Sequence, residues 1–237
     1  MNLKVMSFNT QHCKNYETKK IDYDKVVDLI KQTDADIIGL NEIYGKGFDK
    51  DINMGQAEYL ANKLGYYYYF GMATRLWFKP YGNAIISKYP IKEVKIIKIP
   101  MPLFRRGTQY YEKRNILLAK ILVNNKEVNV VVTHLGLNFD EQENGINTLL
   151  KYVPHERCIL MGDFNMNYDN PLFREIDNVL DDTADLINGN IFTWPSDNPW
   201  VKCDYIFVSK DYKAIKANIL NEIVSDHLPY YCEINIK

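Results

Sequence analysis

The sequence predicts an α/β fold in which two mixed β-sheets pack against each other and helices cover their outer faces. Three observations predict it. Many short runs have strand character, few segments have helical spacing, and several strands are apolar on both faces, as at residues 37–40 and 130–132. Strands that are buried on both sides belong to the interior of a layered structure. The excess of strands over helices argues against a doubly wound parallel sheet.

Three segments have the apolar spacing i, i+3, i+4, i+7 of an amphipathic helix. They are Tyr23–Ile30, Ala57–Leu64 and Ile146–Val153. Gly65 is a natural stop for the second segment, and Pro154 closes the third. Each helix should therefore place one apolar stripe on a core.

The strands are expected between and around these helices. They lie near residues 3–8, 36–41, 66–71, 83–87, 93–99, 115–123, 127–133, 157–162, 203–208, 215–221 and 230–236. No internal repeat or Gly/Ser linker interrupts this order, so we expect one domain spanning residues 1–237. A chain of this length buries a core without disulfides or a structural metal.

The charge balance limits the possible partners. The chain has 29 basic and 30 acidic residues, and its net charge is −1. A dedicated nucleic-acid binder usually carries a basic excess, because contacts to phosphates dominate its affinity. Tight non-specific binding to DNA is therefore not indicated, although a local basic patch remains open.

Cysteine usage and the lack of long apolar runs indicate the compartment. The four cysteines, Cys13, Cys158, Cys203 and Cys232, form no CxxC pair and are expected to be reduced thiols. The first residues have strand character, unlike a signal peptide, and no apolar run approaches the ~18 residues of a membrane helix. We expect a cytoplasmic monomer with no membrane partner.

Polar side chains stand at five strand boundaries. They are Asn9, Asn41 with Glu42, His134, Asp163 with Asn165, and Asp226 with His227. Taken singly, an Asn or Asp after a strand is usually a turn residue, and a lone histidine usually has a structural place. If these boundaries share one edge of the sandwich, they form a polar cluster on rigid elements.

The chemistry of this set is coherent. Carboxylate and amide oxygens, as in Asn9, Glu42 and Asp226, are suited to Mg²⁺ or Mn²⁺. Two histidines with nearby carboxylates suit proton transfer and charge stabilisation. Because His134 and His227 stand at polar boundaries, we expect neither to support the core.

Seven motifs occur in a fixed order along the chain. They are Phe8–Asn9, Leu40–Glu42, Gly82–Ile91, Thr133–Leu135, Gly162–Asn165, Cys203–Phe207 and Ser225–His227. In these motifs, over residues 8–227, the chain resembles the endonuclease/exonuclease/phosphatase superfamily. The resemblance implies a four-layer, deoxyribonuclease-like sandwich. It also implies a metal-dependent phosphoester hydrolase that uses in-line attack of water.

The resemblance implies a role for each matching residue. Glu42 would be the main metal ligand, assisted by Asn9 and Asp226. Asp163 and Asn165 would orient the attacking water and the phosphate.

The remaining matches concern the two histidines and one arginine. His227 would contact the phosphoryl oxygens, with Asp204 behind it fixing its tautomer and charge. His134 would be the second phosphate-binding or acid/base histidine. Arg114 looks like a phosphate-facing arginine, although a solvated charge at the end of a strand is an equal alternative. Asn83 would be structural.

The substrate is less determined by these motifs. Residues 192–197, followed by 203–207, resemble small bacterial metal-dependent hydrolases of the superfamily. A phosphodiesterase or nuclease is favoured, acting on a nucleic acid or a small phosphoester. The alternatives are a phosphomonoesterase for a small ligand such as an inositol phosphate, and a catalytically silent binding protein on the same fold.

Two segments interleave aromatic and basic residues. Phe104–Gly107 and Tyr110–Arg114 could stack bases and hold a backbone, or could be a solvated loop and edge strand. Trp77, Phe78 and Tyr81 precede the fourth predicted strand, where the resemblance to the family implies the rim of the substrate cleft.

Overall fold

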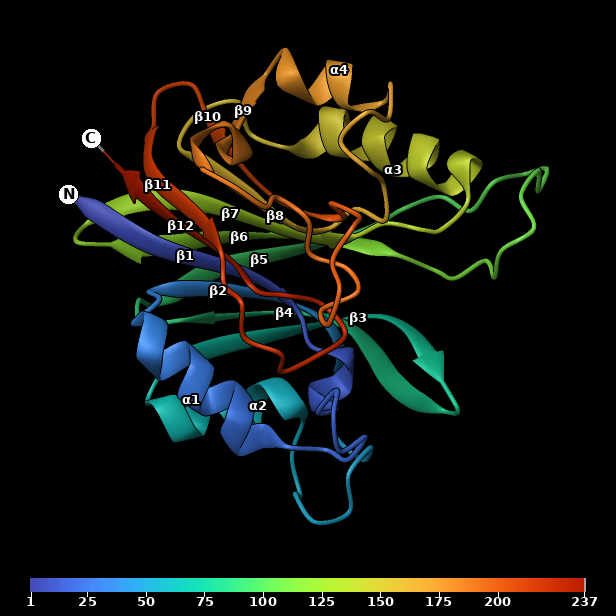
Figure 1. Cartoon of the computed structure of the whole chain (residues 1–237), viewed down its shortest axis with the longest axis vertical. Coiled ribbons are helices and arrows are strands. Elements are labelled where there is room, and N and C mark those ends of the chain that lie inside the picture. The colour runs from blue at the N-terminus through green and yellow to red at the C-terminus, as the bar shows by residue number, and fades with distance from the viewer. Residues whose placement is uncertain (237) are drawn as a thin grey trace.

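The computed structural model describes residues 1–236 and consists of two six-stranded mixed sheets packed face to face (Figure 1). The first sheet contains β1 (Asn2–Asn9), β2 (Ile37–Tyr44), β3 (Tyr67–Leu76), β4 (Lys79–Ser87), β11 (Lys213–Ile219) and β12 (Tyr230–Asn235). Its spatial order is β11-β12-β1-β2-β4-β3.

The second sheet contains β5 (Ile91–Lys98), β6 (Asn115–Val123), β7 (Lys126–His134), β8 (Cys158–Asp163), β9 (Leu180–Asp182) and β10 (Asp204–Ser209). Its order is β5-β6-β7-β8-β10-β9. Both sheets mix parallel and antiparallel pairs, so the predicted fold class is confirmed.

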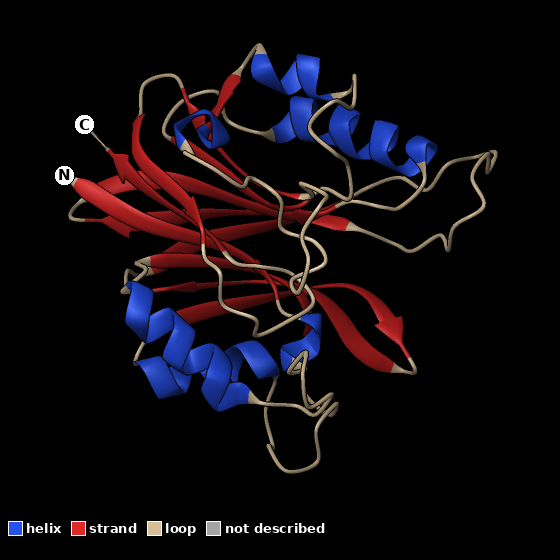
Figure 2. Cartoon of the chain, viewed as in Figure 1, coloured by secondary structure: helices blue, strands red, loops and turns tan. Residues whose placement is uncertain are grey.

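Helices cover the two outer faces, which completes four layers (Figure 2). α1 (Tyr23–Thr33) and α2 (Gln56–Leu64) lie on the first sheet, and α3 (Phe139–Tyr152) and α4 (Phe173–Asp177) lie on the second. Short 3₁₀ helices occupy Gln11–Cys13 and Thr183–Leu186. None of the helices within residues 1–236 is long and apolar enough to cross a bilayer.

Strong local signals set the helix boundaries. The Asp22 side chain accepts a hydrogen bond from the Lys25 amide and so caps the start of α1. Gly65 ends α2 in the left-handed conformation, as its position in the sequence predicts. α3 begins before the predicted segment, because a capping box between Asn138 and Glu141 starts it at residue 139.

The alternation of side chains explains why several strands are apolar on both faces. Val5 and Ile37 point into the core between the two sheets. Met6 and Ile38, one position further along each strand, pack against the helices of the first layer. All four cysteines are buried and unpaired, which confirms the expectation of reduced core thiols.

Some elements differ from the predicted ones. The β3–β4 hairpin pairs as far as Leu76 with Lys79, well beyond the predicted strand ends, because backbone pairing continues where the apolar pattern stops. α4 and β9 are too short for a periodic pattern and were not predicted. β11 lies at residues 213–219 instead of 215–221.

Sheet topology places the polar boundaries together. β1 and β2 are parallel, with Asn9 opposite Asn41, and β7 and β8 are parallel, with His134 opposite Asp163. β10 runs antiparallel to β8 and begins at Asp204, directly opposite Asp163. The carboxyl ends of two strand pairs and the start of a fifth strand therefore share one end of the sandwich.

Candidate active site

Asn9 connects several of the predicted site residues. Its Nδ2 donates to Glu42 Oε1 at 3.1 Å and to Asp163 Oδ2 at 2.9 Å, and lies 3.5 Å from His227 Nε2. Its Oδ1 accepts from the Gln11 amide at 3.1 Å. Asn9 therefore orients both carboxylates and retains one lone pair on its amide oxygen.

An irregularity in β2 sets the direction of the Glu42 side chain. The register with β4 shifts between Leu40 and Ile43, and Glu42 has φ +58°. A bulge turns a side chain out of the regular alternation, and a left-handed non-glycine residue is a strained feature that often marks a functional site. The bulge frees the Glu42 carboxylate from strand packing.

Glu42 and Asp226 form an anionic pair that would suit a divalent cation. Burial, together with the Glu42 charge, raises the pKa of Asp226. The Asp226 carboxylate is held by Gln11 Nε2 at 2.9 Å and by the Ser225 hydroxyl at 3.0 Å. No Lys or Arg side chain forms an ion pair with either carboxylate within residues 1–236. Hard oxygen ligands that pair with no Lys or Arg side chain in the described residues fit Mg²⁺ or Mn²⁺.

His227 is held by Asp204, which begins β10. The distance from His227 Nδ1 to Asp204 Oδ2 is 2.8 Å, and both side chains are buried. Burial opposes protonation, but the negative charges of Asp204 and Asp163 outweigh it and raise the pKa of His227. His227 is therefore an imidazolium with its Nε2 directed at Asp163, 3.7 Å away.

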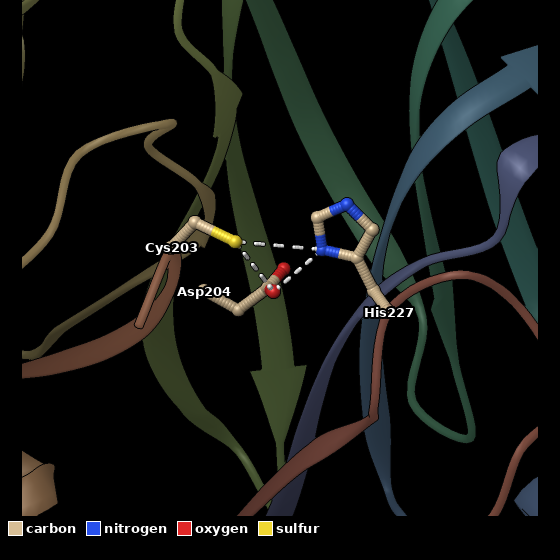
Figure 3. A group of neighbouring side chains, drawn as sticks. All are labelled: Cys203, Asp204 and His227. Carbon is tan, nitrogen blue, oxygen red and sulfur yellow. Dashed lines mark hydrogen bonds and ion pairs between the residues drawn. The ribbon is translucent and has the colours of Figure 1, made fainter. Parts of the chain in front are cut away.

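Cys203 completes a buried group with this pair (Figure 3). Its Sγ lies 3.7 Å from His227 Nδ1 and 3.6 Å from Asp204 Oδ2. The ligating atoms of these three residues lie within 4.8 Å of one another. Burial raises the pKa of the Cys203 thiol to about 12, so the thiol is protonated and serves as packing behind the histidine.

His134 has the opposite electrostatic character. Arg114 Nη1 lies 2.9 Å from His134 Nδ1, and a guanidinium can only donate, so Nδ1 accepts and the ring proton is on Nε2. Burial, and then the Arg114 charge, lower the pKa of His134 well below its usual value. His134 is therefore neutral, with Nε2 3.4 Å from Asp163 Oδ2.

Arg114 lies inside the site. Its guanidinium also pairs with Glu112 Oε1 at 2.9 Å, and both side chains are mostly buried. The alternative of a solvated charge is therefore wrong. The expectation that both histidines avoid the core is wrong as well, because His134 and His227 are buried and hydrogen-bonded.

Asp163 and Asn165 lie between the two histidines. Asp163 Oδ1 accepts from the Asn165 amide at 2.8 Å, and Asn165 Nδ2 lies 3.0 Å from both His134 Nε2 and the Leu135 carbonyl oxygen. Burial raises the pKa of Asp163 to about 7, against the opposing charge of His227. This carboxyl group can accept or release a proton near neutral pH.

Three buried asparagines, Asn41, Asn83 and Asn115, are linked by hydrogen bonds and support the site. Asn41 Nδ2 donates to Asn83 Oδ1 and to the Thr133 carbonyl oxygen, both at 2.8 Å, and Asn41 Oδ1 accepts from the Asp163 amide. Asn83 donates onward to Asn115 Oδ1 at 2.9 Å. These contacts tie the two sheets together directly under Asp163. The structural role expected for Asn83 agrees with this geometry.

No pattern in the sequence singled out His12, Gln11 or Glu112. His12 Nδ1 lies 3.8 Å from Glu42 Oε2, and its ring packs edge-on against Tyr44 and Tyr81. His12 lies in a short 3₁₀ turn after β1 and not at the end of a strand. The strand-boundary pattern therefore could not find it.

A separate hollow of about 550 Å³ contains none of the predicted site residues. It lies beside α4 and β9 and includes the buried ion pair of Lys202 with Asp182, 2.5 Å apart. Burial lowers the pKa of Lys202 despite this partner. The predicted residues instead gather at the strand ends, so the candidate site and this hollow occupy different places.

Comparison with known proteins gives a consistent result. A family model described as the Endonuclease/Exonuclease/phosphatase family matches residues 6–227. A phospholipase C from Staphylococcus aureus is 31% identical over 190 residues, which cover 65% of this chain. The matched region spans 56% of the length of that phospholipase.

Solved structures share the fold over nearly the whole chain. An endonuclease/exonuclease/phosphatase from Beutenbergia cavernae has a TM-score of 0.82 at 19% identity, covering 99% of this chain and 72% of that one. D. rerio TDP2, complexed with a single-strand DNA product, has a TM-score of 0.69 at 16% identity, covering 99% of each chain. At these identities the likeness establishes the fold alone.

Proposed function

The chain belongs to the endonuclease/exonuclease/phosphatase family, whose members hydrolyse phosphoesters, and on that premise we propose that it is a divalent-metal-dependent phosphodiesterase. One observation carries the proposal. A neutral histidine, a protonated histidine and a carboxyl group with a pKa near 7 meet at one end of the sandwich, beside two carboxylates that pair with no Lys or Arg side chain within residues 1–236. Phosphoryl transfer needs positioning and charge neutralisation, and this set supplies the groups for both.

Glu42 and Asp226 would hold the cation, with the remaining lone pair of Asn9 beside them. When bound, Mg²⁺ or Mn²⁺ neutralises charge that develops on the phosphoryl and leaving oxygens. The anionic pair is the feature of this chain that supports such a site. The Asn9 bond to Glu42 fixes the orientation of the carboxylate in advance.

The chain's own groups would act on the phosphoester and the attacking water. His227 would donate from Nε2 to a phosphoryl oxygen, and Asp204 acts through it as a positioning residue. Asp163 would accept a proton from the attacking water. Asn165 and His134 would orient the phosphoryl group from the other side.

The charge inventory favours a diester over a monoester. The Arg114 charge is matched by Glu112 at 2.9 Å, and the His227 charge is matched by Asp204 at 2.8 Å. A phosphomonoester carries close to two negative charges at neutral pH, whereas a diester carries one. A site without surplus positive side chains suits the diester.

A substrate panel tests the proposal. It contains bis(p-nitrophenyl) phosphate, p-nitrophenyl phosphate, an inositol phosphate, phosphatidylcholine and single- and double-stranded DNA, each with Mg²⁺ or Mn²⁺. We expect hydrolysis of diesters, loss of activity with a chelator and recovery on adding Mg²⁺. The Glu42→Gln variant should be inactive, and the exposed control Glu222→Gln should retain activity. Full activity in metal-stripped protein, or turnover of monoesters alone, would overturn the proposal.

A further inference from the structure

Two pairs of large apolar side chains are almost fully exposed to solvent. Trp77 and Phe78 form the turn of the β3–β4 hairpin and are 88% and 92% exposed. Leu103 and Phe104 lie in the loop between β5 and β6 and are 95% and 84% exposed. We call these pairs the hairpin tip and the loop tip. They are the four most exposed large hydrophobic side chains within residues 1–236.

Both tips extend from the edge of the molecule that carries the candidate site (Figure 1). β4 runs from the hairpin tip to Tyr81 and Gly82, which pair with Tyr44 and Ile43, the two residues that directly follow Glu42 and its bulge. The β5–β6 loop returns to Arg114, which contacts His134. The two tips therefore stand on opposite sides of the site, one from each sheet.

The segment that contains the tips is strongly basic, although the whole chain is not. Residues 59–111 contain nine Lys and Arg residues but a single acidic residue, Glu93, although Lys88 pairs with Asp34 and Asp36, and Arg106 pairs with Glu143. Arg75 is exposed beside the hairpin tip, and Arg105 is exposed beside the loop tip, where it stacks on Tyr111. Apolar tips with adjacent basic residues suit a surface that is apolar inside and anionic outside.

We propose that the hairpin tip and the loop tip together dock this protein on an anionic lipid bilayer, with the candidate site facing the membrane surface. The four apolar side chains enter the boundary between headgroups and acyl chains, and Arg75 and Arg105 contact lipid phosphates. This is peripheral docking that needs no membrane-spanning helix. The sequence alone led us to expect no membrane partner, and this proposal differs from that expectation.

The observations favour a bilayer over a nucleic acid or a second copy. Base stacking needs flat aromatic faces, and Leu103 is the most exposed apolar side chain of the four. The tips are also separate projections and not a continuous groove that follows a backbone. A second copy would bring two basic segments together, which like charges oppose.

Vesicle binding tests the proposal directly. Sucrose-loaded vesicles of phosphatidylcholine, with and without phosphatidylglycerol, are sedimented with the wild type and with variants. We expect binding to the anionic vesicles and a loss of about tenfold or more for Trp77→Ser/Phe78→Ser and for Leu103→Ser/Phe104→Ser. Arg75→Gln/Arg105→Gln should weaken binding to the anionic vesicles alone. Ile215→Ser, 46% exposed on β11 at the far edge of the first sheet, is the matched control.

Fluorescence locates the contact. Anionic vesicles should shift tryptophan emission to the blue, and Trp77→Phe should remove the shift, whereas Trp200→Phe should not. Trp200 is also exposed, so it controls for a general effect of lipid.

Two results would overturn docking. One is wild-type protein that binds neither kind of vesicle. The other is tip variants that bind a single-stranded oligonucleotide or self-associate less than wild type while their vesicle binding is unchanged. Hydrolysis of soluble bis(p-nitrophenyl) phosphate is measured for the wild type and every tip variant alongside vesicle binding. Failure of the proposed phosphodiesterase would appear in that assay alone, so the two proposals are tested separately.

Discussion

His227 Nδ1 and Asp204 Oδ2 lie 2.8 Å apart in a pocket closed to solvent, and the second carboxylate oxygen of Asp204 has no hydrogen-bond partner within residues 1–236. A buried carboxylate that has one strong hydrogen-bond partner interacts electrostatically mainly with that partner. The pair therefore sets the charge of the histidine that faces Asp163. Several expected outcomes follow from this and from the surrounding contacts.

Asp204→Asn should shift the pH dependence of turnover. Removing the charge lowers the pKa of His227, so the alkaline limb of the pH–rate profile should move to lower pH. Turnover at pH 8 should fall by about 10²-fold. The profile is measured with bis(p-nitrophenyl) phosphate. Adding Asp204→Asn to His227→Ala should cost little more than His227→Ala alone, because the two residues act as a unit. Multiplicative losses would show that Asp204 acts elsewhere.

His227→Ala should destabilise the fold, since it leaves the Asp204 carboxylate buried without a partner. We expect a loss of about 3 kcal/mol or more in the free energy of unfolding. The raised pKa of His227 gives a stabilising contribution that is complete below about pH 6.5 and is lost as the pH rises through the folded-state pKa. Urea unfolding at pH 6 should therefore show a larger loss than unfolding at high pH. The exposed His155→Ala serves as the control.

Arg114→Gln should raise the pKa of His134, because the Arg114 charge is one of the causes that lower it. His134 would then become protonated at a higher pH, so the acid limb of the pH–rate profile should move upward. Turnover should fall by about 10-fold or more, and Arg114→Lys should recover only part of it, since a point charge lacks the guanidinium fork. An unchanged acid limb in Arg114→Gln would show that Arg114 does not control the protonation of His134 during turnover.

Glu42→Gln should abolish stabilisation by metal. A cation that binds only the folded state raises stability by about 2.7 kcal/mol at a concentration 100 times its Kd. Thermal unfolding of the wild type should shift to higher temperature with Mn²⁺, and Glu42→Gln should show no shift. A wild-type shift retained in Glu42→Gln would place the metal at other residues, such as the Cys203, Asp204 and His227 group.

Asn41→Ala should be among the more destabilising substitutions outside the apolar core. It removes the bonds to Asn83, to the Thr133 carbonyl oxygen and from the Asp163 amide, and leaves those groups buried. The expected loss is about 2–4 kcal/mol in the free energy of unfolding. Asn62→Ala, on the exposed face of α2, should change stability by less than about 0.5 kcal/mol. Equal losses of unfolding free energy in the two variants would show that the Asn41 hydrogen bonds do not stabilise the contact between the sheets.

Local patterns in the sequence were enough to predict most of the helices and strands and the polar residues at their ends. Apolar periodicity acts within one element, so the helix at Ala57–Leu64 and its stop at Gly65 follow from local spacing. Strand ends such as Asn9 and His134 were also visible, because apolar runs stop there. The ordered motifs identified the family without any contact information.

Which of these residues meet, and in what charge state, depends on how distant segments pack together. Asn9 contacts Asp163 across 154 positions of sequence, and Arg114 contacts His134 instead of solvent. Such contacts depend on the order of strands in two sheets, which no local period encodes. Burial then decides protonation: the same residue type is neutral at His134 beside a guanidinium and charged at His227 beside a carboxylate. A side chain's pKa depends on desolvation and neighbouring charge, and both arise only when distant segments pack together.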